Sequence, residues 1–165
     1  MKIVFKLPNR LLEKVHGRLK RPHPFAFERV GFLVCRAGLL DDGGVVMLAH
    51  DLHDIADEDY LDDPGVGAMM GPNAIRKALQ ISYNRQASMF HVHLHLHRGK
   101  PHFSGVDETE TAKFVPDFWN VQPELPHGAI VFSEDSACGK SWIPGLEAPV
   151  DISQFSVVGI PTRKL

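Results

Sequence analysis

The chain has 165 residues, of which 44% are hydrophobic, and its 18 Lys and Arg against 20 Asp and Glu give a net charge of −2. This length predicts a single domain spanning residues 1–165, and the composition excludes intrinsic disorder. The balanced charge predicts neither a nucleic acid nor a membrane surface as a partner. No apolar run approaches the ~20 residues that span a bilayer. The start of the chain is too polar for a signal peptide, and two cysteines make no disulfide scaffold, so we expect a cytoplasmic protein.

The first third of the chain predicts a strand, a helix and a hairpin. Met1–Lys6 alternates as a short strand would. The next segment has apolar positions that recur at helical spacing: Leu11, Leu12, Val15 and Leu19. Phe25–Ala37 is apolar and rich in β-formers, and the turn signal Asp41–Gly44 connects it to Val45–His50, so we expect a hairpin there.

The rest of the chain mixes helices and strands. Asp54–Gly71 is acidic and is predicted to be an exposed loop or insertion. A helix is expected over Pro72–Arg85, a strand over Met89–Leu96, and a second helix over about Ser104–Trp119, kinked or ended by Pro116. Closing strands are expected at Ala129–Phe132, Ser141–Ile143 and Phe155–Ile160. The sequence therefore predicts an α/β (α+β) fold without repeats or linkers.

Histidines alternate along one of these predicted strands. Because successive side chains of a strand point to opposite faces, its apolar residues would face the core: Val92, Leu94 and Leu96. Its imidazoles would share the other face: His91, His93, His95 and His97. Two imidazoles two residues apart can converge on one metal ion, and zinc is the natural partner of such nitrogen ligands. The alternative is a half-exposed polar face.

Two further segments carry acids of interest. Ser104 and Asp107 fit a helix capping box, which would fix a carboxylate in the first turn of the helix, where it could face the end of the strand. Glu28 stands in an otherwise apolar stretch. It is either a strand-edge residue paired with Arg29 or Arg36, or a general base in a partly dry cleft beside a zinc-bound water.

In combination, these segments resemble the JAMM metalloprotease motif of JAB1/MPN domains, most closely its compact prokaryotic branch. The family pattern is an early Glu, then His-x-His, then about seven or eight residues, then Ser-x-x-Asp; here Glu28, His95-Leu96-His97 and Ser104-Gly105-Val106-Asp107 follow it in order. The resemblance implies a JAB1/MPN-like fold, a curved mixed β-sheet flanked by helices.

The resemblance also implies roles for these residues. His95, His97 and Asp107 would hold Zn²⁺, with water in the fourth position. Glu28 would bind that water and act as general base and then as general acid. Ser104 would donate a hydrogen bond to the oxyanion of the tetrahedral intermediate.

Members of the family cleave peptide or isopeptide bonds after the C-terminal glycine of ubiquitin or ubiquitin-like proteins. Bacterial members are often associated with E1-like and E2-like proteins, including in antiphage systems. The resemblance thus implies an isopeptidase that deconjugates or processes a ubiquitin-like protein, whose extended tail can add as a strand to an exposed sheet edge.

The sequence departs from the family pattern in places. Arg98 stands where the family usually has Pro. The extra histidines allow a rival register, in which His93 and His95 are the ligands; we prefer His95 and His97 because of their gap to Ser104. The stretches Asp54–Gly71 and Ser136–Val150 stand about where family insertions contact the substrate, although both can be plain loops.

Other functions compete with the isopeptidase. A non-catalytic MPN-type scaffold would normally have lost the Glu or a ligand, and all five positions are filled here. A zinc nucleobase deaminase requires His-x-Glu and Pro-Cys-x-x-Cys, which the sequence lacks. A non-hydrolytic, His-rich metal-binding barrel would leave Glu28 and Ser104 without roles.

Overall fold

The computed structural model of the chain describes residues 1–165 except 23–25, 64 and 66. Its helices are α1 (Asn9–Leu19), α2 (Pro72–Arg85) and α3 (Gly105–Phe114), with short 3-10 helices η1 (Asp57–Asp59) and η2 (Val115–Asn120). Its strands are β1 (Ile3–Pro8), β2 (Val30–Leu39), β3 (Val45–Asp54), β4 (Tyr60–Leu61), β5 (Met69–Met70), β6 (Ser88–Leu94), β7 (His127–Phe132), β8 (Ala137–Trp142), β9 (Val150–Asp151), β10 (Gln154–Val158) and β11 (Arg163–Lys164).

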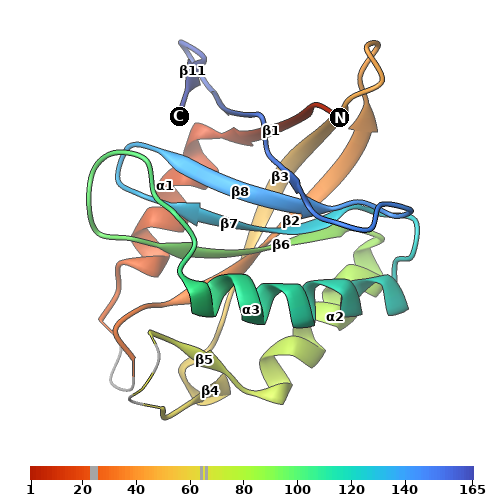
Figure 1. Ribbon diagram of the computed structural model, residues 1–165. Helices are drawn as coiled ribbons and strands as arrows, with labels where there is room; N and C mark the ends of the chain where they lie inside the picture. The colour runs from red at the N-terminus through yellow and green to blue at the C-terminus, as the bar shows by residue number, and fades with distance from the viewer. Residues whose placement is uncertain (23–25, 64, 66) are drawn as a thin grey trace.

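Most of the described strands form one curled, mixed sheet (Figure 1). Its order is β11-β10-β1-β3-β2-β6-β7-β8-β9, and β4 and β5 form a separate two-stranded ribbon. β1 runs parallel to β3 and β10, and β6 runs parallel to β7, whereas the other neighbours are antiparallel. The expectation of a mixed α/β fold with a curved sheet and flanking helices is confirmed.

Two apolar layers hold the helices to the sheet. The apolar side of α1 is buried against one face of the sheet, where its Leu12 and Val15 join Phe5, Phe90 and Ile130. The other layer contains Ala74 and Ala78 of α2, which pack with residues of β2, β6 and η2. Burying a large aliphatic side chain stabilises the fold by about 1.5–3 kcal/mol, which holds α1 to the sheet, whereas α2 packs through small buried residues with Ile75 and Leu79 partly buried beside them.

Several predicted elements are confirmed, and others need correction. The first predicted helix is confirmed as α1, whose buried residues are the four apolar residues that the spacing singled out. The second begins at Pro72, as expected. The predicted hairpin is β2 and β3, but β2 begins only at Val30. Glu28 therefore does not lie inside a strand. The start of the predicted strand at Phe25 lies outside the described residues.

The acidic stretch Asp54–Gly71 is more ordered than the predicted exposed loop. It contains η1, β4 and β5, and both Asp59 and Tyr60 are buried. The Tyr60 hydroxyl accepts a hydrogen bond from the Val30 backbone N–H at 2.9 Å and lies 3.2 Å from the Val30 carbonyl oxygen. This stretch is thus tied to the start of β2; its residues 64 and 66 lie outside the described part of the chain.

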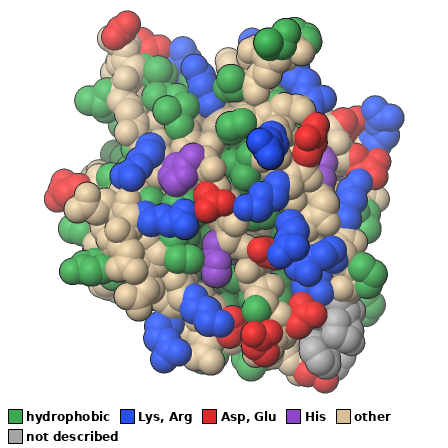
Figure 2. Space-filling view, turned by 180° about the vertical axis from the view of Figure 1, so that it is seen from behind, with side chains coloured by type: hydrophobic (Ala, Val, Ile, Leu, Met, Phe, Trp, Pro, Cys, Tyr) green, Lys and Arg blue, Asp and Glu red, His purple; other side chains and the backbone are tan. Residues whose placement is uncertain are grey.

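Charged side chains gather on the face shown in Figure 2. Lys14 of α1 and Arg85 of α2 both pair with Asp51 of β3, at 3.0 and 2.8 Å. Arg18 and Arg21 both pair with Asp54, at 2.8 and 3.0 Å. Cations of the two helices are thus joined to carboxylates of the strand between them. Among the described helices, none combines the length and apolarity that crossing a membrane requires.

Candidate metal centre

Strand β6 places the histidines in the middle of the sheet. All seven of its residues are buried, and it pairs with β2 on one side and with β7 on the other. Val92 and Leu94 face the α1 layer, as alternation predicts. Leu96, which we expected in the core, is 67% exposed, because β6 ends at Leu94 and the chain then bends.

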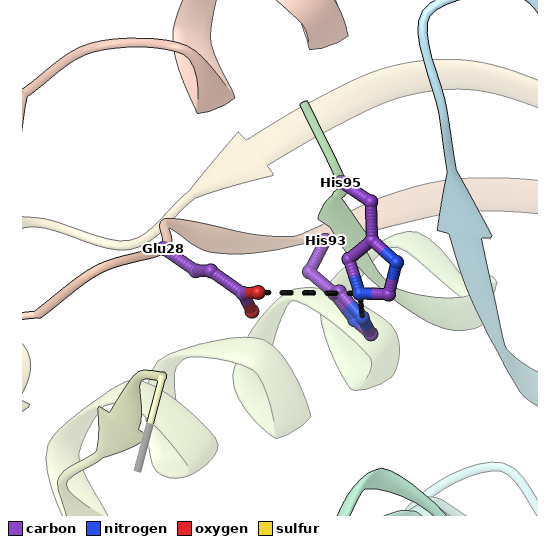
Figure 3. Close-up of side chains that lie close together, drawn as sticks. All are labelled: Glu28, His93 and His95. Carbon is purple, nitrogen blue, oxygen red and sulfur yellow. Dashed lines mark hydrogen bonds and ion pairs between the residues drawn. The ribbon is translucent and has the colours of Figure 1, made fainter. Parts of the chain in front are cut away.

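His93 and His95 converge on one point (Figure 3). Their Nε2 atoms lie 3.2 Å apart, and the ligand atoms of Glu28, His93 and His95 all lie within 4.8 Å of one another. Burial lowers the pKa of His93 to about 4, and it also lowers the pKa of the less buried His95. Both imidazoles are therefore neutral at physiological pH, which is the protonation state that binds metal.

His97 does not join this group. Its Nδ1 lies 2.9 Å from the carbonyl oxygen of Arg98, and its side chain is exposed. The spacing to Ser104 also favours the rival register: residues 96–103, eight in all, separate His95 from Ser104, whereas only six separate His97 from it. Because strand alternation stops after β6, the preferred pair of His95 and His97 is not the pair that the structure brings together.

Asp107 is fixed by the predicted capping box, which is present. Its Oδ2 accepts the Ser104 backbone N–H at 2.7 Å and lies 3.7 Å from His93 Nε2. Burial alone would raise the pKa of Asp107, but the facing His93 and the hydrogen bonds from Ser104 outweigh burial and lower it. The carboxylate is thus ionised and held beside the imidazole pair.

The Ser104 side chain lines the same cavity as His93, His95 and Asp107, and its hydroxyl hydrogen remains able to donate a hydrogen bond. Its Oγ accepts the Asp107 backbone N–H at 3.1 Å, which uses an oxygen lone pair. A hydroxyl carries one donor hydrogen as well as its lone pairs, so the capping role leaves the O–H able to donate to another group.

Glu28 lies in the segment that precedes β2, and its side chain points toward the imidazoles of His93 and His95 (Figure 3). Its Oε1 lies 3.9 Å from His95 Nε2. Its backbone N–H donates to the carbonyl of Gly67 at 3.0 Å. Burial, followed by the negative charge of Asp107, raises the pKa of Glu28. A carboxylate with a raised pKa is better suited to take up a proton near neutral pH.

The residue next to Glu28 anchors this segment, and sequence reasoning missed it. Arg29 is only 4% exposed, and its guanidinium donates to the carbonyls of Arg21 and Pro22 at 3.1 and 2.8 Å and to Asp57 at 2.6 Å. No local pattern predicts these distant partners. The alternative of a Glu28–Arg29 pair is wrong, because Arg29 turns toward Asp57 instead.

The groups described above border one hollow, which we call the central cavity. Its volume is about 480 Å³. Its lining residues include Glu28, His91, His93, His95, Ser104 and Asp107, together with apolar side chains of β2, β5, α2 and α3. Four of the five site residues predicted from the sequence are thus brought together, and His93 takes the place expected for His97.

The ligand separations around His93 match those expected for a zinc ion. Two ligands of a tetrahedral zinc with bonds of 2.0–2.1 Å lie about 3.3 Å apart. The separations of His93 Nε2 from His95 Nε2 (3.2 Å) and from Asp107 Oδ2 (3.7 Å) are close to that value. The Glu28 carboxylate lies 3.9 Å from His95 Nε2 and belongs, with His93 and His95, to the group whose ligand atoms all lie within 4.8 Å of one another, so by distance it is a candidate ligand as well.

No family model matches the chain, and no curated protein matches it in sequence. A function for this chain is therefore inferred from the residues of the site and from their arrangement.

Proposed function

We propose that this chain is a zinc-dependent peptidase of the JAMM type, with a JAB1/MPN-like fold and a cytoplasmic location. One observation carries the proposal: imidazoles from β6, a carboxylate and a hydroxyl from the start of α3, and an acid from the segment before β2 border one cavity. The sheet also holds His93 rigidly, because β6 is hydrogen-bonded to β2 on one side and to β7 on the other.

In this proposal His93, His95 and Asp107 hold the metal ion, which revises the ligand pair expected from the sequence. When bound, zinc supplies Lewis acidity, which polarises a carbonyl group and lowers the pKa of a coordinated water to about 7. The alternative third ligand is Glu28, which belongs to the closest group of ligand atoms. We assign Asp107 because its carboxylate is held by the helix cap and is already ionised.

Glu28 then acts as the proton carrier. It takes a proton from the attacking water as the water oxygen bonds to the scissile carbonyl carbon, and it delivers that proton to the leaving amine as the C–N bond breaks. The Ser104 hydroxyl donates its free hydrogen to the carbonyl oxygen as negative charge develops there. One such donor is typically worth about 2.7–4 kcal/mol of barrier.

The substrate in this proposal is a ubiquitin-like protein with an extended C-terminal tail, which the family resemblance expects to end in glycine. The reaction is either deconjugation or removal of a C-terminal extension, and E1-like and E2-like proteins are the expected functional partners. A non-catalytic scaffold or a plain metal-binding protein is less consistent with the site, because neither needs an acid with a raised pKa or a free hydroxyl beside the metal ligands.

The test is metal content combined with hydrolysis. We expect about one zinc per chain in the wild type and in Glu28→Gln, with hydrolysis of a C-terminal fusion to a ubiquitin-like protein lost in the variant. Asp107→Asn should lose zinc. If Glu28→Gln loses zinc while Asp107→Asn keeps it, Glu28 is a ligand and not the base. If metal-loaded wild type hydrolyses no such fusion, the peptidase proposal fails.

A further inference from the structure

The imidazoles of the candidate metal centre continue outward from His95 to the surface of the protein. The ring centroid of His95 lies 5.0 Å from that of His93, which is 1% exposed (Figure 3). On the other side, the same ring lies 5.7 Å from the ring of His97 and 6.2 Å from that of His102, and both of these side chains are exposed. The partly buried His95 thus stands between one buried imidazole and two imidazoles in solvent.

These ring separations suit imidazoles that share a metal ion. A zinc ion bound to an imidazole nitrogen at 2.0–2.1 Å lies roughly 3.2 Å from the ring centre, so two imidazoles can share one ion when their centroids are up to roughly 6.4 Å apart. Exposed side chains change rotamer within picoseconds to nanoseconds, so His97 and His102 can turn a nitrogen toward such an ion. His95 can therefore bind an ion together with His93 on its inner side, or together with either exposed histidine on its outer side.

The hydrogen bond of His97 prepares this side chain to bind a metal ion. Its Nδ1 lies 2.9 Å from the backbone carbonyl oxygen of Arg98, and a carbonyl oxygen only accepts, so Nδ1 carries the hydrogen. In the neutral imidazole the lone pair then belongs to Nε2. Histidines that ligate metals commonly donate their other ring N–H to a backbone carbonyl in this way, which fixes the tautomer.

The loop that follows β6 is fastened to the turn between β7 and β8. The Glu134 backbone N–H donates to the carbonyl of His97 at 2.9 Å. The Gly99 backbone N–H donates to Asp135 at 2.7 Å, and the Ser133 hydroxyl donates to the Gly99 carbonyl at 2.7 Å. The loop is thus held beside the metal centre, and less conformational freedom is lost when His97 binds an ion.

We propose that His97 and His102 form an outer site that captures zinc from solvent and passes it to the metal centre through His95. The exposed imidazoles bind the ion first, together with His95. His95 then keeps its bond while His93 and Asp107 replace the outer imidazoles and the remaining waters, so the transfer is ligand exchange without any redox step. This inference rests on the metal centre of the proposed function and not on its hydrolytic activity.

A capture site changes the rates of metal binding and leaves its equilibrium unchanged. His97 and His102 hold the ion neither in free solution nor in the loaded centre, so removing them alters the free energy of neither state. Because the dissociation constant is the ratio of the release rate to the uptake rate, both rates must fall by the same factor. A final ligand would behave differently, since its loss raises the dissociation constant.

The experiment measures zinc uptake, zinc release and affinity separately. Metal-free protein is mixed with zinc in a stopped-flow instrument, and a fluorescent zinc chelator reports the free ion. Excess chelator gives the release rate, and equilibrium competition gives the dissociation constant. We expect the double variant His97→Ala/His102→Ala to slow both uptake and release by at least about 10-fold, with the dissociation constant within about 2-fold of the wild-type value.

Two further variants separate the ligand atom from the shape of the loop. His97→Asn keeps an N–H that can donate to the Arg98 carbonyl and lacks the Nε2 atom, so it should slow uptake as much as His97→Ala does. His50→Ala is the control, because His50 is an exposed histidine of β3 whose charged neighbours are Arg36, Arg85 and Asp51. It should leave both rates unchanged.

The outcomes separate the capture site from the other proposals. Unchanged uptake in the double variant, or a raised dissociation constant with unchanged uptake, overturns the capture site and leaves the metal centre in place. Two zinc ions retained per wild-type chain also overturn it, because the outer site would then keep its own ion. Wild-type protein that binds no zinc rejects both the metal centre and the capture site. Normal zinc uptake without hydrolysis of any fusion rejects the peptidase alone.

Discussion

The two sides of the candidate metal centre are held in place in different ways. His93 and His95 belong to, or directly follow, a strand that is hydrogen-bonded on both sides in the middle of the sheet. Glu28 belongs to no strand, and its position depends on the side chain of Arg29 and on the backbone of Gly67. The strand-held side is thus set by local periodicity, whereas the acid side is set by contacts with segments far away in the sequence.

The largest expected effect tests the strand-held side. His93→Ala should lose bound zinc and reduce hydrolysis by at least about 10³-fold, because it removes a proposed ligand. His97→Ala should retain zinc and keep activity within about 2-fold, since His97 lies outside the group and faces Arg98. Metal analysis and kcat/KM of both purified variants check this. If His97→Ala loses zinc and His93→Ala keeps it, His95 and His97 are the ligands, as the sequence analysis preferred.

A second experiment tests the acid side through its anchor. Arg29→Met should lower the free energy of unfolding by about 1–3 kcal/mol, because two partly buried carbonyl acceptors and the Asp57 carboxylate lose their donor. It should also lower kcat by about 10-fold or more while zinc content stays at the wild-type value, since only the acid loses its position. Denaturant unfolding and metal analysis separate the two effects. A variant with normal kcat would show that Glu28 does not depend on this anchor.

A third experiment concerns His127, which supports β6 from the neighbouring strand. Its Nδ1 accepts the Met89 backbone N–H at 3.1 Å, and burial lowers its pKa to about 4. Since the unfolded chain has a His pKa of about 6.5, the folded state is fully stabilised above pH 6.5 and loses up to about 3 kcal/mol as pH falls toward 4. His127→Phe should lack this part of the pH dependence. Urea unfolding of both proteins from pH 7.5 to 4 measures the difference, and equal slopes would contradict it.

The smallest expected effect on hydrolysis is that of a substitution at Gly67. A Cβ atom at position 67 would lie 3.1 Å from Glu28 Oε2, so Gly67→Ala must displace the carboxylate by a few tenths of an ångström. We expect a 3- to 10-fold loss of kcat with KM and zinc content unchanged. Gly17→Ala in α1 is the matched control, because a Cβ there meets nothing within 4 Å among the described residues. A loss confined to KM would assign Gly67 to substrate binding instead.

Much of this architecture follows from local patterns. The apolar spacing of α1, the proline that begins α2 and the capping box of Ser104 and Asp107 are short-range features, and the structure contains all three. The alternation of the histidines also gave the correct shared face for His91 and His93. It failed beyond Leu94, because hydrogen bonding to the neighbouring strands, and not the residue pattern, decides where a strand ends.

The sequence by itself determined which chemical groups this protein has for a metal site and the elements from which most of them project, since helical and strand periodicity depend on neighbouring residues alone. The spacing to Ser104 also favours His93 and His95 as the pair, whereas only the tertiary structure decided that Arg29 turns to Asp57 and that an apolar space opens beside the imidazoles. Those outcomes depend on where separate segments pack against one another, and no local pattern encodes such distances.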